Sequence, residues 1–180
     1  MHKVYKKMCF KDLSNFNATG EYLSIFNGVL ITDLLVIFFL IGGLIQSSVL
    51  KKWYRELNLS AVIADILILF IGILLARFFY PHIFAQYSLA KFVGLAVCIQ
   101  IVHDVCFYQL CKAIPRGQSQ IMDIFKDYGK EVGYKAILAD SAMMVSSILI
   151  ASALKGLSLN TNLVAAVLAV YIVPYAIYSI

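Results

Sequence analysis

Five long apolar runs constrain this chain of 180 residues more than any other feature of its sequence. A helix needs about 20 apolar residues to cross the hydrocarbon core of a bilayer. Five stretches reach that length, at 23–49, 57–80, 89–111, 133–154 and 159–179. Lipid offers no hydrogen-bond partner to an exposed backbone, and the sequence lacks the alternating pattern of barrel strands. We therefore predict an all-α integral membrane protein, a bundle of about five transmembrane helices.

The composition agrees with a chain that lipid, rather than a protein core, must cover. Hydrophobic residues make up 62% of it and charged residues 14%, against roughly half and roughly a quarter in soluble domains. Three prolines and ten glycines leave little material for a flexible linker. We predict a basic, polar N-terminal arm over 1–22 and a single helical bundle over 23–180.

The connections between the runs carry signals of the membrane interface. Aromatic and basic side chains gather there, as in the belts that anchor helices at lipid headgroups. The predicted anchors are Lys51, Lys52, Trp53, Tyr54, Arg55 and Arg116. In the longest connection, apolar residues recur at helical spacing among charged ones, which predicts a short amphipathic helix over 118–132, between the third and fourth spans. That helix lies either on the membrane surface or against protein.

Each of the first four runs contains one aspartate: Asp33, Asp65, Asp104 and Asp140. A charge at the bilayer centre costs about 3 kcal/mol on insertion scales, so such residues face protein or water. We name the side of the membrane that holds residue 1 the N-side, and the other the C-side. Five crossings place Asp65, Asp104 and Asp140 toward the C-side, together with His103.

These residues predict a buried polar cluster in the C-side half of the bundle. Gln100 and Tyr108 belong to it because each lies four residues from Asp104, on one helical face. The full cluster is Asp65, Gln100, His103, Asp104, Tyr108 and Asp140. Basic residues lie just outside it and are expected to pair with its carboxylates. These expected partners are Arg55, Arg116 and Lys135.

A second ionic set is expected in the N-side half. Asp33 comes early in the first run, Arg77 late in the second and Lys91 early in the third. The three should therefore lie at one level of the membrane. Each partner of such a set lowers the cost of burying the other.

Two segments of the chain also resemble each other. The runs "AVIADILILFIGILLA" (61–76) and "AILADSAMMVSSILIA" (136–151) match at several alanines and at the aspartate, with a constant offset of 75. Both would cross the membrane in the same direction, so this is either a parallel repeat of the kind found in transporters or a chance match between apolar segments.

The chemical motifs of enzymes are missing from the sequence. No nucleotide-binding, hydrolase or zinc-protease signature occurs, and the glycine-flanked acid motif of intramembrane aspartyl proteases is also missing. His103, Asp104 and Cys106 point in different directions on a helix, which argues against a metal site. We predict no enzyme, no catalytic residue, no metal or other cofactor, no nucleic-acid partner and no identified small-molecule substrate.

The segments "KWYRELNLSAVIADILI", "QIVHDVCFY", "IPRGQSQIMDIFKDYG", "ILADSAMM" and "VYIVPY" resemble a family of small multi-pass membrane proteins of nucleocytoplasmic large DNA viruses, which infect algae and protists. The likeness covers approximately 52–179. The family implies no activity, but it implies a setting, the lipid membrane beneath an icosahedral capsid, and host endomembranes during infection. Capsid or other virion membrane proteins would then be partners besides the lipid bilayer.

Two functions are expected from these observations. The first is a structural one, that of a minor capsid or membrane protein in the virion inner membrane, which links the membrane to the capsid through 1–22 and 118–132. In that case the buried polar cluster fixes the register of the helices. The alternative is a proton- or cation-conducting channel or transporter that uses the buried Asp/His cluster as its path.

Overall fold

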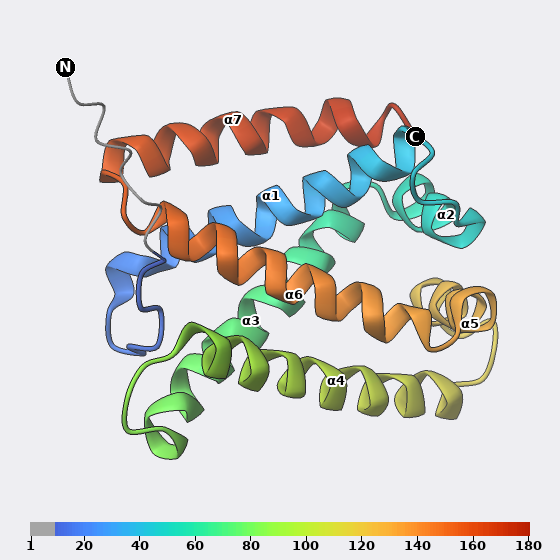
Figure 1. Ribbon diagram of the computed structural model, residues 1–180. Coiled ribbons are helices and arrows are strands. Elements are labelled where there is room, and N and C mark those ends of the chain that lie inside the picture. The colour runs from blue at the N-terminus through green and yellow to red at the C-terminus, as the bar shows by residue number, and fades with distance from the viewer. Residues whose placement is uncertain (1–9) are drawn as a thin grey trace.

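The computed structural model describes residues 10–180, and all regular elements in that range are helices (Figure 1). Five of them are long and apolar enough to cross a membrane. They are α1 (Tyr22–Ile41), α3 (Leu59–Ile83), α4 (Leu89–Ala113), α6 (Lys135–Leu154) and α7 (Leu159–Ile177). Two short helices, α2 (Ser48–Leu57) and α5 (Gln120–Val132), and a turn of 3₁₀ helix, η1 (Thr19–Glu21), complete the fold. The predicted all-α membrane bundle is confirmed.

The first span is shorter than the apolar run that predicts it. The run 23–49 is one span by composition, but α1 ends at Ile41 and α2 begins at Ser48. Gly43, with a φ of +75°, turns the chain after α1, a conformation that glycine adopts at little cost. Ser47 then caps α2, because its hydroxyl accepts a hydrogen bond from the Leu50 N–H at 3.0 Å. The Gly-Gly pair and the following Gln46, Ser47 and Ser48 mark this turn in the sequence, but an apolar run counted by length alone passes over it.

The amphipathic helix between the third and fourth spans is present as α5. Ser119 caps it, and its hydroxyl accepts a hydrogen bond from the Met122 N–H at 3.4 Å. Ile124 is only 2% exposed, and the ring of Phe125 lies 4.8 Å from the ring of Trp53 on α2. The apolar face of α5 therefore packs on protein, which decides between the two placements left open by the sequence.

The fold contains the same three-helix unit twice. In α1–α2–α3 and again in α4–α5–α6, a span runs to the C-side, a short helix follows there, and a second span returns (Figure 1). The connections 42–47 and 114–119 have equal length, and both end in Gln-Ser. In each case this serine caps the next helix. We call the two units the first and the second repeat.

The junction after each short helix provides independent support for the duplication. Asn58, between α2 and α3, has φ 49° and ψ −126°, and Gly133, between α5 and α6, has φ 57° and ψ −133°. Positive φ is rare outside glycine, and these two residues are 75 apart, the offset seen in the sequence. At that offset "WYRELNLSAVIAD" (53–65) aligns with "YGKEVGYKAILAD" (128–140). Chance similarity between apolar segments does not produce matching junctions.

The two repeats pack with approximate two-fold symmetry. Helix α1 packs against α6, and its counterpart α4 packs against α3. The short helices α2 and α5 run side by side in opposite directions. The Glu131 carboxylate at the end of α5 accepts hydrogen bonds from the N–H groups of Ser48 (2.8 Å) and Val49 (2.9 Å) at the start of α2. Reciprocally, Glu56 at the end of α2 accepts one from Gln120 at the start of α5 (2.9 Å), as in an isologous interface.

Helix α1 forms the centre of the bundle and contacts α3, α6 and α7. Its closest approach is to α6, where a Cβ built on Gly28 would lie 2.5 Å from the Ser147 carbonyl oxygen. Small residues allow helices to approach closely in lipid, where van der Waals contact rather than the hydrophobic effect drives their association. Helix α7 lies outside the repeats and covers α1.

The described part of the N-terminal arm, from residue 10 onward, is folded against the N-side of the bundle. Leu13 is fully buried. Arg77, also fully buried, forms an ion pair with Glu21 at 3.1 Å and donates to the carbonyl oxygens of Asn15 and Ala18. Lys155 pairs with Glu21 as well. Residues 10–22 of the predicted N-terminal arm over 1–22 therefore pack against the bundle, and residues 1–9 lie outside the described range.

Candidate functional site: an acid cluster at the repeat interface

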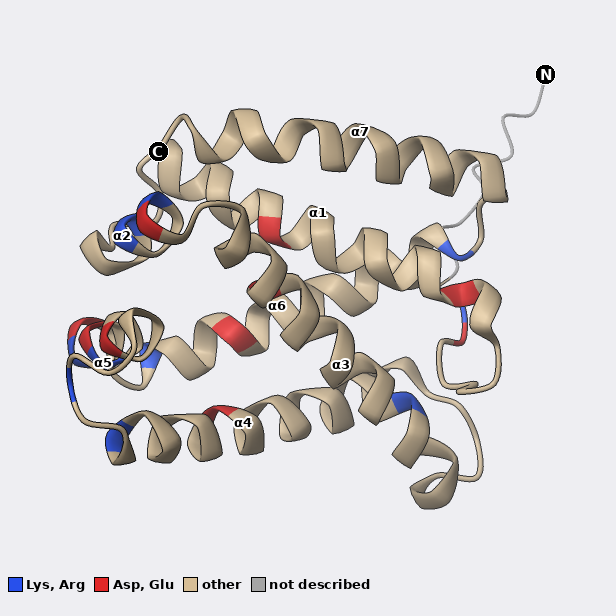
Figure 2. Cartoon of the chain, turned by 180° about the vertical axis from the view of Figure 1, so that it is seen from behind, with Lys and Arg blue, Asp and Glu red and all other residues tan. Residues whose placement is uncertain are grey.

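The four membrane aspartates lie in the half of the bundle nearer to α2 and α5, as the acidic positions of α1, α4 and α6 show (Figure 2). Asp65 and Asp140 are equivalent in the two repeats, at the offset of 75. Asp33 and Asp104 both lie about two turns before the end of the first span of their repeat. Each repeat thus supplies one aspartate from each of its two spans. We call Asp33, Asp65 and the side chains bonded to them the first half-site, and Asp104, Asp140 and the side chains bonded to them the second half-site.

In the first half-site, a phenol and an indole connect the two carboxyl groups. The Tyr54 hydroxyl lies 3.0 Å from Asp33 Oδ1 and 3.0 Å from Asp65 Oδ2. The Trp53 Nε1–H donates to the same Asp65 oxygen at 3.0 Å. Asp33 is fully buried, and Tyr54 is 1% exposed. Three helices, α1, α2 and α3, are therefore held together at one buried point.

The surroundings of Tyr54 keep its hydroxyl protonated. Burial raises the pKa of Tyr54 well above its usual value, and the negative charges of Asp65 and Asp33 and its hydrogen bonds to them raise it further. At neutral pH the phenol is thus a neutral group with one proton to donate.

In the second half-site the two carboxyl groups are not connected. Asp104 Oδ1 accepts a hydrogen bond from Gln100 Nε2 at 2.7 Å, and His103 Nδ1 lies 3.2 Å away. Asp140 is half-buried, and no side-chain hydrogen bond holds it within residues 10–180. Gly129 occupies the position that corresponds to Tyr54. The second half-site therefore lacks the phenol that bridges the first.

Tyr128 of α5 is the counterpart of Trp53 at the offset of 75. Burial raises its pKa to about 12, and the negative charges of Asp140, Asp65, Glu131 and Asp104 contribute to the shift. Charges from both repeats therefore act on one phenol of α5, while Trp53 and Tyr54 of α2, which packs beside α5, bond Asp33 and Asp65.

The expected ion pairs with this cluster do not form. Arg55 donates to the carbonyl oxygen of Ile180, and Arg116 forms an ion pair with Asp127 at 2.7 Å. Lys135 forms no ion pair in the part of the chain that the structure describes. Over the same residues, no lysine or arginine pairs with any of the four membrane aspartates. The basic side chains of α2 are exposed on its outer face, whereas Trp53 and Tyr54 point toward the bundle, and Lys135 is exposed at the start of α6.

The expected N-side set of Asp33, Arg77 and Lys91 is also wrong. Asp33 belongs to the first half-site, Arg77 pairs with Glu21, and the Lys91 ammonium lies 5.4 Å from the centre of the Phe84 ring. The error follows from the length of the first span. Because α1 ends at Ile41 rather than near residue 49, Asp33 lies closer to the C-side than the apolar run implies.

Two of the predicted interfacial anchors are site residues instead. Trp53 and Tyr54 are 5% and 1% exposed, whereas Lys51, Lys52 and Arg55 are exposed on the outer face of α2. Aromatic residues beside basic ones are typical of membrane belts. The sequence pattern therefore predicted anchors at Trp53 and Tyr54 and gave no sign of their hydrogen bonds to aspartates. The repeat gives the signal that could have found them, since it aligns Trp53 with Tyr128 beside equivalent aspartates.

Of the predicted cluster, Tyr108 lies outside it. Its side chain is 52% exposed, and the Lys112 ammonium lies 5.2 Å from the centre of its ring. Asp65, Gln100, His103, Asp104 and Asp140 lie in or beside the half-sites, as described above. Tyr108 lies at the edge of the face that Gln100 and Asp104 share, and its ring lies beside Gly129 of α5, 3.7 Å from a Cβ built there.

A seam of polar side chains continues from the cluster toward the N-side along α1. Thr32 donates to Ser146 at 3.2 Å, and Asn27 Nδ2 donates to the Asn162 carbonyl oxygen at 2.8 Å. Ser147 is fully buried beside them. The seam ends at a hollow of about 230 Å³ on the N-side, whose polar lining includes Glu21, Ser24, Lys155 and Asn162.

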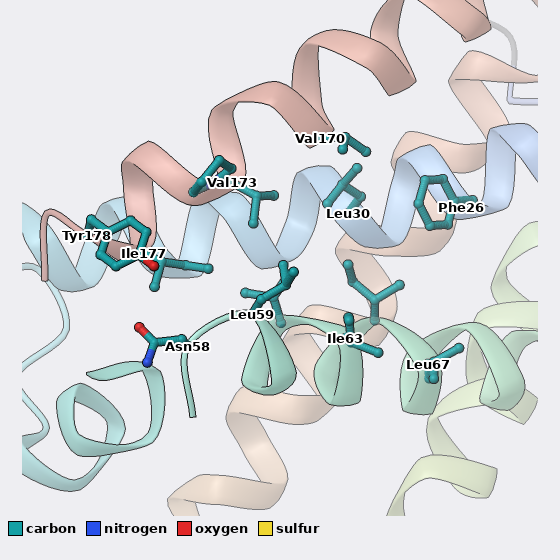
Figure 3. Close-up of a pocket in the computed structure, with 13 residues that line it drawn as sticks. Phe26, Leu30, Asn58, Leu59, Ile63, Leu67, Val170, Val173, Ile177 and Tyr178 are labelled. Carbon is teal, nitrogen blue, oxygen red and sulfur yellow. The ribbon is translucent and has the colours of Figure 1, made fainter. Parts of the chain in front are cut away.

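A larger groove of about 500 Å³ lies between α3 and α7, over α1 (Figure 3). Its lining is apolar, with Leu30, Ile63, Val173 and Ile177 among the side chains, and Asn58 lies at its α2 end. No aspartate lines this groove, so it is separate from the acid cluster.

The chemistry that the cluster can perform is proton binding. Carboxyl, phenol, imidazole and amide groups exchange or relay protons. Within residues 10–180 no group of three or more His, Cys, Asp or Glu side chains is placed to hold a metal ion. No protein-family model, no curated protein and no solved structure matches the chain.

Proposed function

We propose that this protein binds protons in the acid cluster and conducts them across the membrane, as a proton channel or transporter. The observation that carries the proposal is the convergence of four carboxyl groups from four spans with no lysine or arginine paired to them in residues 10–180. A structural ion-pair network would need those cations. Intramembrane carboxyl groups without them are typical of proton relays.

The position of the cluster supports the same function. In transporters built from repeats, ion and substrate sites lie at the interface between the repeats. Here that interface holds carboxyl groups from both repeats, and the polar seam along α1 leads from it to the hollow lined by Glu21 and Lys155 on the N-side. The exposed face of the α2–α5 pair lies at the other end of this route.

Proton flux into proteoliposomes tests the proposal. The full chain is reconstituted into vesicles loaded with a pH-sensitive dye, and a potassium diffusion potential drives protons inward. We expect faster acidification than in protein-free vesicles, and loss of that flux in Asp140→Asn, which removes a proton-binding group. Asp127→Asn, an acid-to-amide change on the exposed face of α5, is the matched control and should conduct like the wild type.

Two results would contradict the proposal. One is wild-type flux equal to that of empty vesicles although circular dichroism shows the folded helical protein. The other is undiminished flux in the double variant Asp104→Asn/Asp140→Asn, since this variant lacks both carboxyl groups of the second half-site.

A second candidate function is structural, as a minor capsid or membrane protein in the virion inner membrane of a large DNA virus. The bonds from Tyr54 and Trp53 to Asp33 and Asp65 favour it, because they hold α2 rigidly on the bundle. The viral setting rests on the sequence resemblance. Proteomics of purified virions after detergent stripping tests it: we expect recovery with the membrane and capsid fraction, and absence from particles would exclude this role.

A further inference from the structure

We propose that the first half-site holds one bound proton at neutral pH, shared between Asp33 and Asp65 through the Tyr54 hydroxyl. The site is a proton-storage site, and its ligand is a single proton. Its occupancy is independent of transport. Only the further consequence, that flux passes through the second half-site while the first stays loaded, rests on the proposed function.

The count of hydrogen atoms carries this inference. The Tyr54 hydroxyl contacts one oxygen of each carboxyl group, both at 3.0 Å, but a phenol has one hydrogen to donate. It can therefore satisfy one carboxylate. The second contact brings two oxygens together without a hydrogen unless that carboxyl group is protonated and donates to the phenol oxygen.

Burial identifies which groups need the proton. Asp33 is fully buried, and its Oδ2 has no hydrogen-bond partner. An ionised Asp33 would leave a negative charge on an unsatisfied oxygen in a low-dielectric interior, which is costly. Asp65 has more hydrogen-bond donors, since its Oδ2 accepts from Trp53 and can also accept from Tyr54. The consistent arrangement is a protonated Asp33 that donates to Tyr54, while Tyr54 donates to an ionised Asp65.

This arrangement has a mirror form with the same atoms. If the Asp33 proton moves to the Tyr54 oxygen while the Tyr54 proton moves to Asp65, then Asp65 donates to Tyr54 and Tyr54 donates to Asp33. One proton has passed from Asp33 to Asp65, the phenol is neutral in both forms, and the total charge is unchanged. The bound proton is therefore shared rather than fixed on one residue.

The groups that face the half-site do not replace the proton. The groups of the second repeat whose charges act together with Asp65 on Tyr128 of α5 are Asp104 on α4, which His103 contacts, and Asp140 on α6. The acidic ones among them add negative charge. The basic residues of α2, Lys51, Lys52 and Arg55, are exposed on its outer face, and Arg77 of α3 is held at the N-side by Glu21. In α7 the titratable side chains are Tyr171 and Tyr175, which are exposed and bonded to each other.

Infrared spectroscopy of the reconstituted full chain tests the inference. A protonated carboxyl group has a C=O stretch that is separate from the bands of a carboxylate and shifts in D₂O. We expect this band in the wild type at neutral pH and its loss in Asp33→Asn, in which Asp65 can ionise with Tyr54 and Trp53 as donors. Asp127→Asn, on the exposed face of α5, should retain the band.

The outcomes separate the inference from the proposed function. Absence of the band in the folded wild type, or an unchanged band in Asp33→Asn, would overturn the inference whatever the flux. If Asp33→Asn fails to fold, Tyr54→Phe gives a second test: loss of the phenol should shift the band to higher frequency, and an unshifted band would overturn the inference. A band that behaves as expected without any proton flux would refute only the proposed function.

Discussion

The two repeats share one backbone plan and differ at the centre of their half-sites. In the first repeat, α2 supplies Tyr54, which reaches both Asp33 and Asp65. In the second, Gly129 stands at the corresponding position, and Asp104 and Asp140 have no bridge between them. A single residue of the short helix thus separates a bridged pair of carboxyl groups from an unbridged pair. Under the proposed function, the bridged pair holds the structure and the unbridged pair exchanges protons.

The largest effect is expected from removal of the bridge. Tyr54→Ala deletes a buried aromatic ring and both of its hydrogen bonds, so the free energy of unfolding should fall by about 3–5 kcal/mol, as for other large-to-small changes in a core. The loss is measured by detergent-induced unfolding in mixed micelles, followed by circular dichroism. Tyr108→Ala, a change to a side chain that is 52% exposed, is the control and should cost far less. Equal losses would mean that the first half-site is not a structural centre.

A smaller effect is expected when only the hydroxyl is removed. Tyr54→Phe keeps the ring but leaves Asp33 with no hydrogen-bond partner, which should cost about 1–3 kcal/mol of unfolding free energy. Trp53, the single tryptophan of the chain, donates to Asp65 and reports the change by its fluorescence. If stability and emission both match the wild type, the phenol does not bridge the two carboxyl groups.

The reciprocal contacts of α2 and α5 should differ in strength. Glu131 accepts two backbone hydrogen bonds at the start of α2, whereas Glu56 accepts one from a side chain. Glu131→Gln should therefore cost more, about 0.5–1 kcal/mol, the low end for a helix cap because the carboxylate is exposed. A thermal-unfolding comparison of Glu131→Gln with Glu56→Gln checks this order. The reverse order would contradict the described pairing.

The Glu131 contribution should also depend on pH. Burial acts to raise the pKa of this group, but the hydrogen bonds from Val49 and Ser48 outweigh it and hold the pKa below its usual value. Since the folded form binds its proton less readily, the stabilisation is present above about pH 4.3, the ordinary pKa of glutamate, and is lost as the pH falls through the lower folded-state value. Glu131→Gln should lose this component of the acid sensitivity.

The smallest effect is expected at the position that lacks the bridge. A Cβ on Gly129 would meet only Tyr108, at 3.7 Å, an ordinary contact. Gly129→Ala should therefore raise the unfolding free energy by about 0.5–1 kcal/mol through helix propensity, with unchanged proton flux. A clear loss of stability would show that the second half-site is as tightly closed as the first.

Much of the fold could be predicted from the sequence, because lipid requires helices of a certain apolar length with satisfied backbone hydrogen bonds. Apolar length predicts the five spans, and helical spacing predicts α5. Apolar length alone missed the boundary at Ile41, although the Gly-Gly pair and Gln-Ser that follow it are turn and helix-cap residues. Because this boundary was missed, Asp33 was predicted to lie in the N-side half of the bundle rather than in the first half-site.

The site was harder to predict than the fold. One aspartate in each of four spans is visible in the sequence, and so is the offset of 75 that relates Asp65 to Asp140. The hydrogen-bond partners of these aspartates are not visible in the sequence, because the general expectation in membranes is that carboxylates pair with nearby arginines. Here α2 turns Arg55 away from the cluster and Trp53 and Tyr54 toward it, and Arg116, in the connection before α5, pairs with Asp127 instead. The direction of a side chain on an interfacial helix depends on what it packs against, which a single sequence does not give.

The comparison between the repeats is tested most directly by proton flux in Asp33→Asn and Asp104→Asn, the equivalent change in each half-site. Asparagine resembles a protonated aspartate in shape and charge, so at Asp33, where the proton is retained, we predict flux close to that of the wild type. At Asp104, where the proton must exchange, we predict loss of flux with the fold intact by circular dichroism. Loss of flux in Asp33→Asn, or normal flux in Asp104→Asn, would contradict the division of roles between the two repeats.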